Sequence, residues 1–153
     1  MLTITVLLAD DHQIIREGLR SCLEHDLTIK IIGEARNGRE AVKLTKKLNP
    51  AVVVMDISMP VLNGLDATQE ILSTHPQTKI LLLSANSEDA YIDKAILIGA
   101  AGYLSKDSSA HNLARAIQEV HQGKMFFGFS SSERTLAPKS SRKAKQPKKP
   151  VGP

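Results

Sequence analysis

Short apolar runs alternate with amphipathic stretches along most of this chain, and the alternation strongly restricts the folds it can adopt. Five runs have the composition of β-strands, at residues 3–10, 28–35, 51–56, 79–85 and 102–106. Each is followed by a stretch whose apolar residues recur with helical periodicity, at 12–25, 38–48, 63–75, 87–100 and 108–123. Strands that alternate with helices in this way predict a parallel sheet with right-handed crossovers.

The polarity of the runs predicts where each strand lies in the sheet. The runs at 28–35 and 102–106 contain polar interruptions, which suit the edges of a sheet, whereas 51–56 is apolar up to its last residue. We therefore predict an α/β fold: a flavodoxin-like, doubly wound, five-stranded parallel sheet of order 2-1-3-4-5 with five helices. In such a fold a ligand site lies beyond the carboxyl ends of the first and third strands.

Charge is distributed unevenly along the chain. Residues 1–122 contain 12 Lys/Arg and 15 Asp/Glu, a net charge of −3, whereas residues 123–153 contain 8 and 1, a net charge of +7. From about residue 129 the sequence is rich in Ser, Lys and Pro and has almost no aliphatic periodicity. We predict a folded domain over residues 1–125 and a disordered basic tail or interdomain linker over residues 126–153.

Composition argues against several classes of protein. Aromatic residues make up 3% of the chain, with no Trp, which disfavours a single-strand nucleic-acid binder built on stacking platforms. The one cysteine, Cys22, cannot form an internal disulfide, as is usual in a reducing cytoplasm. No N-terminal signal is visible, and no apolar run approaches the ~20 residues of a membrane helix. We expect a cytoplasmic protein without membrane contact.

Polar side chains stand at the ends of four of the five predicted strands. These residues are Asp10 and Asp11, Asp56, Ser84 and Lys106. Each has an ordinary explanation by itself, because an aspartate can cap the next helix and a single serine or lysine is usually a solvated surface residue. The ends of parallel strands meet along one edge of the sheet, however, so we expect all five side chains to form one site. The five histidines are scattered, without metal-ligand spacing.

Three carboxylates at one edge require positive charge. Unit charges ~4 Å apart interact by about 4 kcal/mol at an effective dielectric near 20, so crowded carboxylates protonate or bind a cation. Mg²⁺ prefers a few carboxylate oxygens together with water and a phosphate. With Mg²⁺ on Asp11 and Asp56, an oxygen of Asp56 can attack a phosphoryl group and form an aspartyl phosphate. Lys106 would then neutralise the phosphoryl oxygens, and Ser84 would donate a hydrogen bond to one of them.

Together these motifs resemble the receiver domain of two-component response regulators. The resemblance covers residues 3 to about 125 and rests on Asp10-Asp11, the "DISMP…NG" run from Asp56 to Gly64, Ser84-Ala85 and Tyr103…Lys106. The segments "ADDHQIIREGL", "GAAGYLSKD" and "AIQEVHQGKMFF" are similar to the NarL/FixJ (LuxR-type) branch of that family.

The resemblance implies a role for each site residue. It implies Asp56 as the phosphoacceptor and Asp10 and Asp11 as acids of the metal site, which binds Mg²⁺ or, in its place, Mn²⁺. It implies the main-chain carbonyl of Ser58 as a further metal ligand. It also implies Ser84 and Tyr103 as a switch pair and Lys106 as the cation that senses the phosphoryl group.

The resemblance further implies a signalling protein rather than an enzyme. A sensor histidine kinase would supply the phosphoryl group, and the output would be control of transcription. Whether phosphorylation produces a homodimer stays open at this point. The branch normally continues into a helix-turn-helix domain, whereas nothing after Phe129 has helical periodicity. DNA contact is therefore expected only through a C-terminal domain that is absent from this chain.

Three alternatives remain open at this point. The chain could be a stand-alone receiver that acts by protein–protein contact, or it could bind nucleic acid through its tail. It could also be an aspartyl-phosphate phosphatase, although haloacid-dehalogenase-like enzymes place a second acid where this chain has Ser58. Stoichiometric labelling by a small phosphodonor with Mg²⁺, as opposed to turnover, separates a receiver from a phosphatase.

Overall fold

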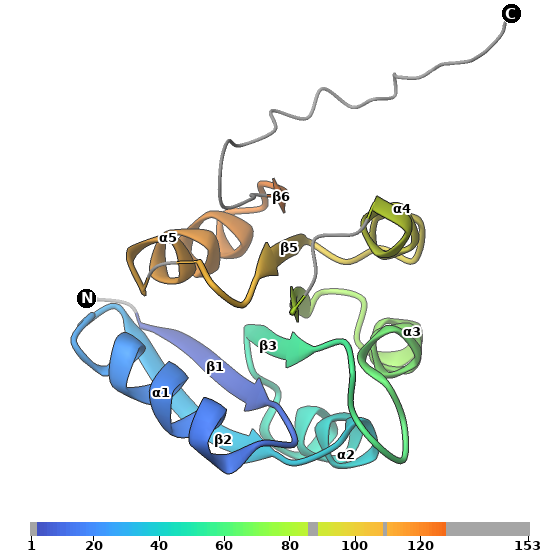
Figure 1. Cartoon of the computed structure of the whole chain (residues 1–153), viewed down its shortest axis with the longest axis horizontal. Coiled ribbons are helices and arrows are strands. Elements are labelled where there is room, and N and C mark those ends of the chain that lie inside the picture. Colours follow the sequence, from blue (N-terminus) through green and yellow to red (C-terminus); the bar gives the residue numbers. More distant parts are fainter. Residues whose placement is uncertain (1–2, 86–88, 109, 128–153) are drawn as a thin grey trace, which may run out of the picture.

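A parallel sheet between two layers of helices forms the folded part of the protein (Figure 1). The structure, a computed structural model, describes residues 3–85, 89–108 and 110–127. The strands are β1 (Ile4–Ala9), β2 (Ile29–Ala35), β3 (Val52–Asp56), β4 (Lys79–Ser84), β5 (Gly102–Ser105) and β6 (Phe126–Phe127). The helices are α1 (Gln13–Glu24), α2 (Gly38–Leu48), α3 (Gly64–Thr74), α4 (Asp89–Leu97) and α5 (Ala110–His121). None of these helices is long and apolar enough to cross a membrane.

The strand order confirms the predicted fold class. The order is β2-β1-β3-β4-β5-β6, with every neighbouring pair parallel, so the five predicted strands follow the predicted order. The edge position predicted for residues 102–106 is wrong, because β6 lies outside β5. Figure 1 shows α1 and α5 on one face of the sheet and α2, α3 and α4 on the other. The carboxyl ends of β1 and β3 therefore lie side by side, as a site between these strands requires.

The sixth strand extends the sheet beyond the prediction. Phe126 pairs with Gly102 and Phe127 with Tyr103, so the first two residues of the predicted tail belong to the sheet. A side chain at Gly102 would place its Cβ 2.6 Å from the Phe126 carbonyl oxygen, so a glycine at this position lets the two strands approach. Two residues are too few to show a period of their own. Residues 128–153 of the predicted tail lie outside the described part of the chain.

Strand β3 is buried along its whole length and joins the two halves of the core. Val53 and Met55 pack in the cluster under α2, α3 and α4, whereas Val52 and Val54 pack in the cluster under α1 and α5. Burial on both faces explains why this strand reads as a continuous apolar run. Each such side chain contributes roughly 1.5–3 kcal/mol relative to exposure, so the end of β3 is held firmly in place.

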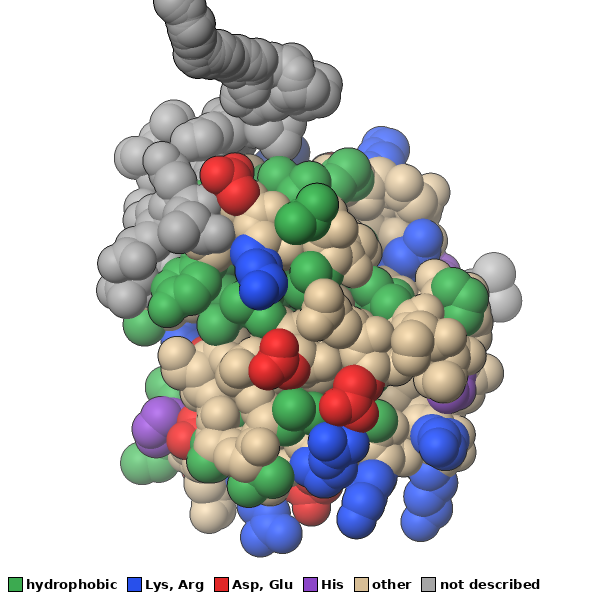
Figure 2. All heavy atoms as spheres, turned by 90° about the vertical axis from the view of Figure 1, so that its right-hand side faces the viewer, with side chains coloured by type: hydrophobic (Ala, Val, Ile, Leu, Met, Phe, Trp, Pro, Cys, Tyr) green, Lys and Arg blue, Asp and Glu red, His purple; other side chains and the backbone are tan. Residues whose placement is uncertain are grey.

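The outer surface of α2, α3 and α4 has a basic and an apolar end (Figure 2). Lys and Arg side chains gather at the lower end, over α2, where Arg39 forms a two-pronged ion pair with Glu70 of α3 at 2.8 and 3.2 Å. Hydrophobic side chains are more frequent towards the upper end, where α4 exposes Tyr91, Ile96 and Leu97. This layer therefore offers apolar contact surface mainly at α4.

Candidate functional site

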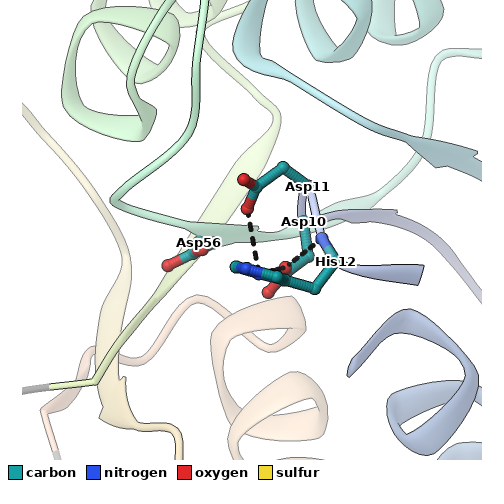
Figure 3. A group of neighbouring side chains, drawn as sticks. All are labelled: Asp10, Asp11, His12 and Asp56. Carbon is teal, nitrogen blue, oxygen red and sulfur yellow. Dashed lines mark hydrogen bonds and ion pairs between the residues drawn. The ribbon is translucent and has the colours of Figure 1, made fainter. Parts of the chain in front are cut away.

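The charged residues predicted at the strand ends meet at the carboxyl edge of the sheet. One ligand atom from each of Asp10, Asp11, Asp56 and the neighbouring His12 lies within 4.8 Å of the others. Figure 3 shows these four residues. The Lys106 ammonium lies between two of the acids, 2.9 Å from Asp10 Oδ2 and 3.1 Å from Asp56 Oδ2. Three carboxylates and one ammonium thus share one small volume, which leaves an excess of negative charge.

The main chain around Asp10 fixes the first pair of acids. The Asp10 amide donates to the carbonyl of Ala35 at 3.0 Å, and its carboxylate accepts from the His12 amide at 2.9 Å. The Asp10 carbonyl accepts from Arg16 Nη1 at 2.6 Å, and Arg16 Nε donates in turn to Glu34 Oε1 at 3.0 Å. Asp10 is therefore tethered to β2 directly through its amide and indirectly through a buried arginine.

Sequence reasoning missed Arg16, which is 8% exposed on α1. It lies two helical turns before Leu23, the other buried residue of the helix, and so on the same face. A charged residue in the apolar stripe of a helix, together with Glu34 at the end of a neighbouring strand, was the available signal. Burial raises the pKa of Glu34, but hydrogen bonds from Arg20 and Arg16 outweigh it and hold that pKa below its usual value.

The segment after Asp56 explains the "DISMP…NG" motif. The Asn63 side chain caps α3 by accepting from the Asp66 amide at 2.9 Å. A Cβ at Gly64 would lie 2.3 Å from the Asp56 carbonyl oxygen, so only glycine lets α3 begin against the strand end. Between Asp56 and Asn63, Val61 adopts a positive φ of 72°, which is strained for a β-branched residue. The motif thus folds the chain tightly back over Asp56.

The electrostatics of Asp56 reflect opposing influences. Asp56 is 3% exposed, and this burial raises the pKa of its carboxyl group. The Lys106 hydrogen bond lowers that pKa and the charge of Asp10 raises it, so that the net shift is upward. Burial lowers the pKa of Lys106, because it disfavours the charged ammonium. The hydrogen bonds from Lys106 to Asp10 and Asp56 outweigh burial, so the pKa of Lys106 is raised overall. Each charge thus favours the ionised form of the other, against the effect of burial.

The donor set suits a hard divalent cation. Asp10 and Asp56 are buried, and Asp11 Oδ1 is a buried oxygen that accepts no well-formed hydrogen bond from the described residues. Carboxylate oxygens with excess negative charge are what Mg²⁺ selects. The Ser58 amide donates to Asp56 Oδ1 at 3.3 Å, which holds this exposed residue beside the acids. The residues present therefore fit a Mg²⁺ ion.

The two predicted switch residues lie at different depths. Ser84 ends β4 and is 5% exposed, and the Lys106 amide donates to its carbonyl at 2.8 Å. Tyr103 lies on β5 opposite Leu82 and is fully buried in the cluster under α2, α3 and α4. The structure thus brings Ser84 to the edge that carries the acids and places Tyr103 deeper, in the core.

Comparisons with known proteins agree with this geometry. The profile of the response regulator receiver domain matches residues 6–118. The chain is 43% identical over 122 residues to the transcriptional regulatory protein LnrK of Bacillus subtilis (strain 168), covering 80% of this chain and 56% of LnrK. It is 41% identical over 123 residues to the response regulator UvrY of Escherichia coli (strain K12), with the same shares covered. The chain thus spans about half the length of these curated relatives.

Solved structures give the same result. The signal receiver domain of NarL from Mycobacterium tuberculosis superposes with a TM-score of 0.78 at 32% identity, covering 81% of this chain and 100% of that one. A LuxR-family two-component response regulator from Aurantimonas sp. SI85-9A1 gives the same TM-score at 33% identity, covering 81% and 89%. Sequence profile, sheet order and clustered acids agree, and the chain belongs to the response regulator receiver domain family, in its NarL/FixJ (LuxR-type) branch.

Proposed function

We propose that Asp56 accepts the phosphoryl group in this receiver domain, from a sensor histidine kinase and with Mg²⁺ bound. The observation that carries the proposal is the position of Asp56: it is buried at the end of the central strand, 3.1 Å from the Lys106 ammonium and beside two further acids. Family membership supports a phosphoacceptor module in general, and this geometry supports Asp56 as the acceptor within it.

The chemistry follows from the positions of the charges. A carboxylate oxygen of Asp56 forms a bond to phosphorus while the bond from phosphorus to the donor, such as an imidazole nitrogen, breaks, and the leaving group takes up a proton. The carboxylate must be ionised to attack, and the Lys106 ammonium 3.1 Å away favours the ionised form against the effect of burial. As charge moves to the phosphoryl oxygens, the ammonium is already within reach of them because it starts 3.1 Å from Asp56 Oδ2.

The acids hold the cation that this transfer needs. Asp10, Asp11, Asp56 and the main-chain carbonyl of Ser58 are the proposed ligands, with Mn²⁺ able to replace Mg²⁺. When bound, Mg²⁺ neutralises negative charge on the phosphoryl oxygens. Asp10 Oδ2 faces Lys106 at 2.9 Å, so this acid also orients the ammonium.

Phosphorylation is proposed to act on output through Ser84 and Tyr103. A new phosphoryl group would draw in the Ser84 hydroxyl as a hydrogen-bond donor and leave space beside α4 for Tyr103 to rotate into. The surface formed by the exposed apolar side chains of α4 would then change shape, which would alter the binding of a partner or of a second copy of the chain. The name of LnrK, a transcriptional regulatory protein, supports control of transcription as the proposed output. A DNA-binding domain that is not part of this chain is the proposed route to that output.

Phosphoryl transfer from acetyl phosphate tests this function. With Mg²⁺, we expect intact-mass measurement to show one phosphoryl group on the wild-type chain and none on Asp56→Asn or after EDTA treatment. Asp93→Asn is the matched control, because Asp93 is an exposed acid on α4, and it should label like wild type. Release of many phosphates per chain would favour a phosphatase instead, and equal labelling of Asp56→Asn would exclude Asp56 as the acceptor.

A further inference from the structure

His12 places an imidazole among the acids of the site (Figure 3). Its Nδ1 lies 3.1 Å from Asp11 Oδ1 and 3.3 Å from Asp10 Oδ1. His12 occupies the N-cap position of α1, but its side chain makes no capping hydrogen bond and is turned towards the carboxylates instead. The sequence pattern did not predict this, because a histidine next to two aspartates lacks the usual spacing of metal ligands.

The separations match those of ligands on a single ion. Two donors at about 2.1 Å from one cation, at the angles of tetrahedral or octahedral coordination, lie about 3.0 to 3.4 Å apart. The two distances from His12 Nδ1 fall in this range, and Asp56 contributes a fourth donor within 4.8 Å. A cation at the centre of this group would thus be within reach of one nitrogen and several oxygens.

The nitrogen changes which cations the site prefers. Carboxylate and carbonyl oxygens suit Mg²⁺ and Mn²⁺, whereas an imidazole nitrogen suits later first-row transition cations such as Co²⁺, Ni²⁺ and Zn²⁺. We propose that His12 is a ligand that makes this site a binding site for such transition cations, in addition to Mg²⁺. This inference rests on the proposed function, because it requires that Asp11 and Asp56 bind a divalent cation.

A rival explanation makes the opposite prediction. His12 is 65% exposed and could serve only as a protonated partner of the two acids. In that case its removal would leave more negative charge in the site, and every divalent cation would bind more tightly. As a ligand, in contrast, His12 contributes to the binding of Ni²⁺ but hardly to that of Mg²⁺.

Calorimetric titration of the whole chain with Ni²⁺ and with Mg²⁺ separates these explanations. For His12→Ala we expect the Kd for Ni²⁺ to rise about tenfold or more, while the Kd for Mg²⁺ changes by less than about twofold. His12→Asn should also weaken Ni²⁺ binding, because an amide side chain offers a cation an oxygen but no nitrogen ligand. The matched control is His25→Ala, an exposed histidine at the other end of α1, which should leave both constants unchanged.

A spectroscopic readout makes the test independent of affinity alone. Co²⁺ added to the wild-type chain should give a visible absorption spectrum that changes in His12→Ala, since the nitrogen ligand is lost. An unchanged Co²⁺ spectrum, an unchanged Ni²⁺ affinity, or a parallel increase in the affinities for Ni²⁺ and Mg²⁺ would overturn the proposal. Failure of the proposed metal site itself is distinguishable, because Mg²⁺ binding would then be insensitive to Asp11→Asn and Asp56→Asn.

Discussion

Replacement of Lys106 by methionine would remove the positive charge that two buried acids share. Asp10 and Asp56 are 0% and 3% exposed, and the Lys106 ammonium lies 2.9 and 3.1 Å from their carboxylates. Methionine has a similar length and no charge, so Lys106→Met keeps the packing and deletes the cation. We expect the variant to be less stable than wild type in the absence of metal.

The size of the effect follows from these distances. At an effective dielectric near 20, each ion pair contributes about 5 kcal/mol of gross attraction. Several kcal/mol of this are offset by the desolvation of the ammonium, and protonation of Asp56 limits the penalty in the variant. We therefore expect the free energy of unfolding to fall by about 3 kcal/mol near neutral pH, a typical loss when one partner of a buried pair is removed.

The pH dependence of the loss has a definite sign. Lys106 lowers the pKa of Asp56, so its removal raises that pKa further above the usual value of 3.8. A carboxyl group with a raised pKa in the folded state destabilises the fold when it is ionised, and this penalty disappears as the group protonates. The difference between Lys106→Met and wild type should therefore shrink as the pH falls towards the usual aspartate value.

Urea unfolding with EDTA, and again with saturating Mg²⁺, measures this difference. Mg²⁺ should reduce the difference in the free energy of unfolding between Lys106→Met and wild type. The reason is that a bound cation replaces the missing charge and stabilises the folded state by mass action. Lys43→Met on α2 is the control, since Lys43 is exposed, and it should have little effect. If Lys106→Met were as stable as wild type with EDTA, or if Mg²⁺ left the difference unchanged, Lys106 would not be the counter-ion of these acids.

Three further substitutions test other parts of the account. Ser84→Ala should still take up beryllofluoride at Asp56 but show smaller NMR shifts on α4 than wild type, and shifts equal to wild type would exclude Ser84 as the coupling residue. Burial raises the pKa of Glu34, but two arginines of α1 hold it below 4.5, so Glu34→Gln should lower the free energy of unfolding by about 1 kcal/mol. That loss should be fully present above pH 4.5 and disappear as the pH falls through the folded-state pKa of Glu34, which lies below 4.5. A pH-independent loss would contradict the assignment. Gly64→Ala should lower the free energy of unfolding by about 1–3 kcal/mol in urea, because the added Cβ would lie 2.3 Å from the Asp56 carbonyl oxygen. An unchanged free energy of unfolding would contradict this packing.

The order of the five predicted strands was correct, because polarity identified β2 as an edge strand and β3 as a central one. The edge position predicted for β5 was wrong, since β6 pairs with β5 and all four β5 residues are buried. The continuous apolar run before Asp56 required burial on both faces, and β3 indeed lies between β1 and β4 with side chains packed in both core clusters. Once the strands are parallel and ordered, their carboxyl ends must converge, so the meeting of Asp10, Asp56 and Lys106 followed from topology. This part of the site needed no knowledge of side-chain conformation.

The parts that sequence reasoning missed depend on side-chain direction or on very short segments. Arg16 reaches back from α1 to the Asp10 carbonyl, a contact that helical periodicity alone does not specify. His12 faces the acids because its side chain does not cap α1, and the sequence offers no sign of that choice. Strand β6 has two residues, which is below the length at which alternation can be recognised.

The identity of the phosphorylated residue tests the central claim most directly. The whole chain would be labelled with acetyl phosphate and Mg²⁺, treated with borohydride to reduce any acyl phosphate to the alcohol, and mapped by peptide mass spectrometry. The account predicts reduction at Asp56 alone, giving a homoserine at that position, and none in the EDTA control. Reduction at Asp10, Asp11 or any other residue of the wild-type chain, with Asp56 unmodified, would contradict it.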